Sequence, residues 1–70
     1  MNKDLKLKES RFNGLTDTID YYFWQTNEGF GLSPEQREQL EETRNAVSCF
    51  GEIGTKWAEL ADEILGRKIA

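Results

Sequence analysis

The sequence predicts an all-α protein: a helical hairpin whose long C-terminal helix can kink, dimerising into a helical bundle. A strong helix-start signal at Ser33-Pro34 and apolar residues at helical spacing on both sides of it support this fold class. Seventy residues form one domain, residues 1–70, and a core of this size rarely supplies more than about 3 to 5 kcal/mol. Because the single Cys allows no intramolecular disulfide, we expect a homo-oligomer to supply the remaining stability.

The first helix is expected from Lys8 to Gln25, with the N-terminus up to residue 9 frayed or extended. Its apolar residues follow the spacing of a buried helical stripe: Phe12, Leu15, Ile19, Tyr22 and Phe23. A β-hairpin turn at Asn13-Gly14 is the alternative, since the preceding residues alternate as in a strand. A two-residue turn there would pair an apolar face with a polar one, so the helix is favoured.

The second helix has a complete start signal in residues 32–36, Leu-Ser-Pro-Glu-Gln. Ser33 can accept a hydrogen bond from a free backbone N–H, Pro34 suits the first helical position, and Gln36 completes a capping box. The glycine-containing segment 26–31 is short, which makes the two helices antiparallel neighbours.

Apolar residues recur every seven positions from this start onward, in two series: Leu40, Val47, Gly54 and Ala61, and Phe50, Trp57 and Ile64. Gly51 and Gly54 each cost about 1 kcal/mol relative to Ala inside a helix. The repeat nevertheless passes through them in phase, so one long helix, kinked near Gly51, is preferred. Its predicted oligomer seam is Leu40, Val47, Phe50, Trp57 and Ile64. The alternative is a three-helix bundle with a break at Gly51 to Gly54.

The net charge of −4 is concentrated in the middle of the chain. Residues 12–42 carry Arg37 against seven acids: Asp17, Asp20, Glu28, Glu35, Glu38, Glu41 and Glu42. Residues 1–11 are mildly basic instead. A negative centre favours a protein partner with a basic surface and argues against direct nucleic-acid binding.

These acids accompany aromatic residues in the candidate partner-binding set: Asp17, Asp20, Tyr21, Trp24, Phe30, Glu35, Glu38 and Glu42. If Tyr22 and Phe23 face the core, the four members from the first helix line its opposite face. Acids beside exposed aromatics are typical of a binding hot spot, and a carboxylate row can imitate a phosphate backbone. Two alternatives remain: a third helix could cover Trp24 as a core residue, and the acids could simply solvate a helix.

We expect protein binding without catalysis, because there is no His and no Cys–His or Ser–His arrangement. No catalytic residue, metal or cofactor is predicted. The most specific expectation is an inhibitor of phage or mobile-element type that occupies a basic surface of a nucleic-acid-handling or defence protein. The alternatives are an assembly subunit acting through its seam, and an oligomer that sequesters a nucleotide through Arg11, Arg37 and Arg44.

The sequence has no long apolar run and no signal-peptide pattern. We therefore expect a cytoplasmic protein, in the host cytoplasm if it is phage-encoded, that does not enter a membrane.

Overall fold

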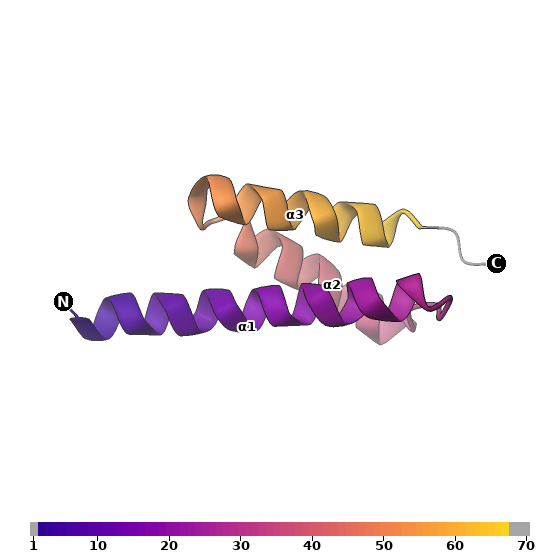
Figure 1. Ribbon diagram of the computed structural model, residues 1–70, viewed down its shortest axis with the longest axis horizontal. Coiled ribbons are helices and arrows are strands. Elements are labelled where there is room, and N and C mark those ends of the chain that lie inside the picture. Colours follow the sequence, from indigo (N-terminus) through magenta and orange to yellow (C-terminus); the bar gives the residue numbers. More distant parts are fainter. Residues whose placement is uncertain (1, 68–70) are drawn as a thin grey trace.

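The computed structural model describes the backbone of residues 2–67 and the side chains of residues 9–67. It contains three helices, α1 (Asn2–Asn27), α2 (Pro34–Val47) and α3 (Gly51–Leu65), arranged as in Figure 1. Within residues 2–67 there is no strand, so the all-α prediction is confirmed and the hairpin at Asn13-Gly14 does not form. The described backbone is helical from Asn2, so an extended N-terminus is not what the structure shows, while fraying of these residues stays a prediction. Their Lys, Leu and Glu side chains are good helix formers, and α1 continues through them.

The preferred long C-terminal helix is also wrong, and the three-helix alternative describes the fold. α2 ends at Val47, and α3 begins at Gly51 after a turn of residues 48–50. The N–H groups of Cys49 and Phe50 donate to carbonyls three residues earlier, at 3.3 and 3.1 Å, which tightens this turn. Gly51 has a φ of +75°, a conformation that costs residues with a Cβ about 1 to 2 kcal/mol. Gly51 therefore starts a reversal of the chain and not a kink.

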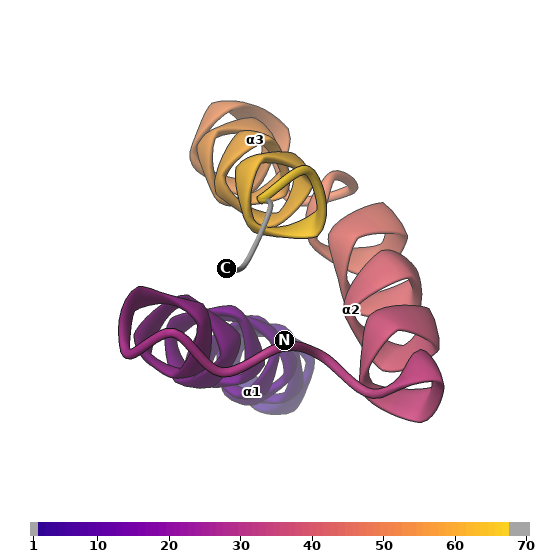
Figure 2. The ribbon, with the colours of Figure 1, turned by 90° about the vertical axis from the view of Figure 1, so that its right-hand side faces the viewer.

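The seven-residue repeat survives this reversal because each helix buries its own apolar stripe. Leu40 and Val47 of α2 and Gly54 and Ala61 of α3 are all buried. The end-on view in Figure 2 shows the three helices at the corners of a triangle, so α2 and α3 each turn one face toward the common interior. The seven-residue repeat of apolar residues therefore stays in phase although the helix is interrupted between Val47 and Gly51.

The core is built from a single chain. It consists of seven hydrophobic side chains with at most 3% exposure: Ile19, Tyr22, Leu40, Val47, Ala58, Ala61 and Ile64. Partly buried residues surround them, including Phe12, Phe23 and Trp57. Each large apolar side chain that is fully buried contributes about 1.5 to 3 kcal/mol. Three members of the predicted oligomer seam, Leu40, Val47 and Ile64, thus pack inside one chain, and Phe50 and Trp57 are half-buried at its edge. Assembly with a second copy stays a prediction.

The capping box at the start of α2 forms as predicted. The Gln36 N–H donates to Ser33 Oγ at 3.1 Å, and the Ser33 N–H donates to Gln36 Oε1 at 3.0 Å. Gln36 also connects the helices, since Gln25 Nε2 donates to Gln36 Oε1 at 3.1 Å and to the Gly31 carbonyl at 2.8 Å. These bonds join the end of α1, the connecting loop and the first turn of α2.

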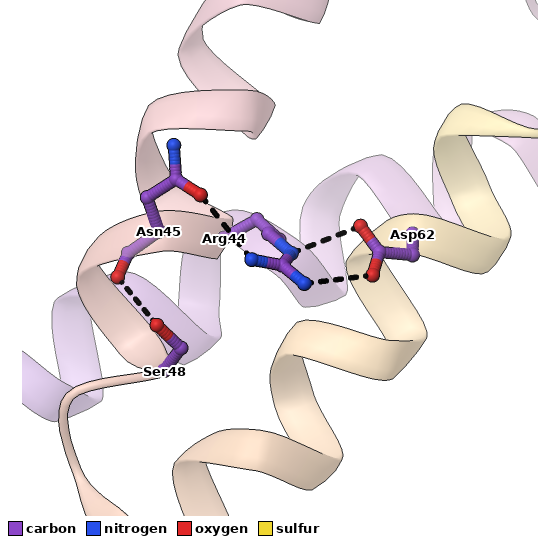
Figure 3. Close-up of polar contacts among 4 residues, drawn as sticks. All are labelled: Arg44, Asn45, Ser48 and Asp62. Atoms are coloured by element: carbon purple, nitrogen blue, oxygen red, sulfur yellow. Dashed lines mark hydrogen bonds and ion pairs between the residues drawn. The ribbon is translucent and has the colours of Figure 1, made fainter.

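Arginine side chains fix the antiparallel arrangement of α2 and α3. The Arg44 guanidinium donates to both Asp62 carboxylate oxygens, at 3.0 and 3.2 Å (Figure 3). Arg37, nearer the start of α2, donates to the carbonyl of Leu65 at the end of α3 at 3.0 Å. Both pairs lie at the surface, where such interactions are each worth about 1 kcal/mol or less. They define the register of two helices whose attraction comes mainly from apolar burial.

Arg67 closes the far end of α3 against α1. Its guanidinium donates to Thr26 Oγ1 at 3.0 Å and to Asn27 Oδ1 at 2.6 Å, and it lies 4.8 Å from the centre of the Phe23 ring. At the opposite end, the rings of Phe12 and Phe50 are 5.2 Å apart. The N-terminal turns of α1 extend past this point, beyond the turn that joins α2 to α3 (Figure 1).

Gly54→Ala should destabilise the protein. A Cβ at this position would lie 2.0 Å from the Val47 carbonyl oxygen and 3.2 Å from the Val47 carbonyl carbon. Because these are backbone atoms that cannot rotate away, we expect a loss of about 3 kcal/mol in the free energy of unfolding. Urea unfolding followed by far-UV circular dichroism measures it.

Gly14→Ala is the matched control, since Gly14 is also helical but a Cβ there would meet no atom within 4 Å. This change should stabilise the protein by up to about 1 kcal/mol. Equal effects of the two substitutions would contradict the close approach of α3 to the end of α2.

Candidate protein-binding surface

Two aromatic side chains lie exposed on the outward face of α1. Tyr21 is 55% exposed and Trp24 is 54% exposed, with their ring centres 6.1 Å apart and the planes tilted by 38°. Asp17 and Asp20 lie on the same side of the helix and are exposed as well. The structure therefore places these four residues as their spacing predicted, while their contact with a partner stays a prediction.

The third helix does not cover this face. Phe23, the neighbour of Trp24, is the aromatic residue that turns toward α3, where it contacts Arg67. Trp24 lies about 100° further round α1 and remains exposed. The alternative in which a chain break makes Trp24 a core residue is thus not what the structure shows.

A hollow separates this face of α1 from α2. It has a volume of about 350 Å³ and is lined by Asp17, Thr18, Tyr21, Tyr22 and Gln39, and we call it the Tyr21 groove. The buried Tyr22 hydroxyl donates a hydrogen bond to Gln39 Oε1, which joins the two walls. Thr18 Oγ1 is turned back onto its own helix, donating to the Gly14 carbonyl at 3.0 Å. The open part of the groove is therefore bordered mainly by the Tyr21 ring and the Asp17 carboxylate.

Carboxylates of α2 continue the acidic character beside the groove. Glu35 and Glu42 lie four residues before and three residues after Gln39, so they share its side of the helix, and Glu38 lies next to them further outward. All three are exposed. Among the side chains of residues 9–67, the ion pairs are Arg44–Asp62 and Arg67–Glu63, so no described cation neutralises these carboxylates.

Phe30 lies at the tip of the loop that joins α1 to α2. It is 60% exposed and follows Gly29, which has a φ of +89°. Its N–H donates to the Gln25 carbonyl at 3.1 Å, so its backbone is held against the last turns of α1. The exposed ring thus lies at the same end of the molecule as Trp24 and the first turn of α2.

Thr18 and Gln39 line the groove but are absent from the predicted partner-binding set, and Tyr22 was expected only in the core. The spacing of Gln39 from Glu35 and Glu42 places it on their side of α2, which was the available signal. Its position opposite Tyr22 depends on how α1 and α2 align, which helix periodicity does not determine.

The three arginines proposed to contact a nucleotide do not converge. Arg37 and Arg44 donate to groups of α3. Arg11 lies elsewhere, in a second hollow of about 380 Å³ that it lines with Ala46, Cys49 and Phe50 near the end of α2. Within one chain these side chains therefore do not share a site, and a nucleotide pocket between two copies stays a prediction.

The described residues contain neither a metal-binding cluster nor a membrane-spanning helix. No group of three or more His, Cys, Asp or Glu side chains among them is placed to hold a metal ion. In the same part of the chain, no helix has the length and hydrophobicity needed to cross a lipid bilayer.

The chain matches no protein-family model, no curated protein and no solved structure. Its function is accordingly argued from the residues and the geometry of this surface.

The Tyr22 hydroxyl gives the groove a measurable titration. Burial raises the pKa of Tyr22 above its ordinary value of 10.0, and the neighbouring Tyr21 raises it further. A raised pKa in the folded state means that folding favours the protonated phenol. That contribution is complete below pH 10 and is lost as the pH rises through the folded-state pKa.

Tyr22→Phe should therefore reduce the loss of stability at alkaline pH. In the unmodified chain, the free energy of unfolding in urea should fall as the pH rises above about 10. The variant should start about 1 kcal/mol less stable at pH 8, because the bond to Gln39 is gone, and then fall less steeply. Tyr21→Phe keeps the Tyr22–Gln39 bond and the burial that is the larger cause of the raised pKa, so it should keep most of the steep fall. An unchanged slope in Tyr22→Phe would contradict this assignment.

Proposed function

We propose that this protein is a small acidic protein-binding module. Its contact surface is the outward face of α1 together with the adjoining side of α2: Asp17, Asp20, Tyr21, Trp24, Phe30, Glu35, Glu38 and Glu42. The observation that carries the proposal is the exposure of Tyr21 and Trp24 on an acidic face although the chain already has a closed core. Packing within the chain gives no reason for this arrangement, whereas a partner does.

The energetics of association favour such a surface. A Tyr or Trp side chain can bury 150 to 250 Å², and residues of these types dominate the free energy of many interfaces. The surrounding carboxylates attract a basic surface over long range, which raises the association rate and excludes acidic proteins. The aromatic pair thus supplies affinity, and the carboxylates select the class of partner.

The sharpest form of the proposal is an inhibitor. Glu35, Glu38 and Glu42 form a row along α2, and Asp17 on α1 lies across the hollow from Gln39 of that helix. Such a row presents negative charge to a basic groove much as a phosphate backbone does. A phage or mobile element could use a molecule of this kind to block a nucleic-acid-handling or defence protein in the cytoplasm of its host.

Trp24→Ala should abolish partner capture while leaving the fold intact. The tagged protein is incubated with nuclease-treated bacterial lysate, and the retained protein is identified and quantified. We expect at least a tenfold loss of that protein in Trp24→Ala, because the variant removes a large contact side chain outside the core.

Ile53→Ala is the matched control, since Ile53 is 58% exposed but lies on α3. It should retain the captured protein, and release by high salt should confirm that the acids contribute. Capture that survives Trp24→Ala, or that requires nucleic acid, would contradict the proposed surface.

A further inference from the structure

The Tyr21 groove combines an aromatic face with a carboxylate that has no described cationic partner. Asp17 and Tyr21 are four residues apart on α1, so their side chains are neighbours along one side of the helix. The Trp24 ring, 6.1 Å from the Tyr21 ring, extends the aromatic surface by another turn. A positively charged group in the hollow would therefore meet π-electron density and a carboxylate together.

The opposite wall is held in place and does not supply a competing charge. Gln39 Oε1 accepts the Tyr22 hydroxyl hydrogen bond, which fixes the neutral amide at the border of the groove. Arg37 and Arg44, the described cations of α2, both donate to α3. The groove is thus formed by the fold, and no cation among the described side chains of residues 9–67 pairs with its carboxylate.

The chemistry of the groove, an aromatic ring beside a carboxylate, favours a guanidinium over an ammonium. A planar guanidinium stacks on an aromatic ring and can donate two parallel hydrogen bonds to one carboxylate. A lysine ammonium is a compact, strongly hydrated charge that makes neither arrangement as well. Glu35 and Glu42, on the same side of α2 as Gln39, add long-range attraction for either cation but do not distinguish them.

We propose that the Tyr21 groove binds an arginine side chain of the partner protein, with the guanidinium stacked on Tyr21 and hydrogen-bonded to Asp17. This inference rests on the proposed function, because the arginine belongs to the basic surface that the module occupies. It adds a specificity that overall charge does not supply: partners with an exposed arginine are selected over partners whose basic surface is built from lysine.

The test uses three capped peptides of alternating glycine and a second residue, which is arginine, lysine or the neutral arginine analogue citrulline. Each is titrated into the full-length ¹⁵N-labelled protein, and backbone amide and Trp24 indole shifts are followed by NMR. We expect the arginine peptide to shift Thr18, Tyr21, Tyr22 and Gln39 and to bind at least threefold more tightly than the lysine peptide. The citrulline peptide should cause no shifts at the same concentration.

Asp17→Asn and Tyr21→Leu should each weaken arginine-peptide binding at least threefold. Glu59→Gln, which removes one exposed carboxylate from α3, is the charge-matched control and should leave binding within twofold. Equal binding of the arginine and lysine peptides, or shifts centred on α3, would overturn the proposal. If that happened while Trp24→Ala still abolished partner capture, the arginine groove would fail and the proposed function would stand.

Discussion

The reversal of the chain at Gly51 is the constraint on which the rest of the structure depends. It requires a left-handed backbone conformation at Gly51 and the absence of a side chain at Gly54, where α3 crosses the end of α2. Once the chain has turned, α3 lies antiparallel to α2 and both helices bury their apolar stripes against α1. The core can then close within one chain. Since that closure uses only the inward side of α1, the aromatic and acidic residues on its outward side remain available to solvent.

Opposite charges occupy different places in this arrangement. Three arginines act at the joints between helices: Arg37 and Arg44 connect α2 to α3, and Arg67 connects α3 to α1. Asp62 and Glu63 are the carboxylates that pair with them in the described part of the chain. The acids of α1 and α2 whose side chains are described are all exposed, and none of them pairs with these arginines. The acidity of the binding surface thus follows from where the fold places its cations as much as from the excess of acids in the sequence.

Local signals in the sequence predicted much of the fold. Ser33 and Gln36 form the expected capping box, and Leu40, Val47, Gly54 and Ala61 are buried as their spacing indicated. The seven-residue repeat stays in phase across Gly51 and therefore predicts a continuous helix there, despite the helix cost of two glycines. The close approach of Gly54 to the Val47 carbonyl, which explains the turn, exists only in the folded chain. The same difference between local signals and contacts formed on folding applies to the candidate surface. The exposure of Tyr21 and Trp24 follows from the periodicity of one helix, whereas the place of Gln39 depends on the alignment of two.

That alignment is set by hydrogen bonds between polar side chains. Gln25 bonds to Gln36, and Tyr22 bonds to Gln39, so sliding α1 along α2 by one turn would break both connections. None of these four residues belongs to the proposed contact set, although Tyr22 and Gln39 line the Tyr21 groove. Substitutions at exposed positions usually change stability by no more than about 0.5 kcal/mol. Substitutions among the outward residues should therefore change the stability little, whereas substitutions at the four residues that align the helices should weaken the packing of α1 on α2. The residues that align the helices are thus different from the exposed residues proposed to meet a partner.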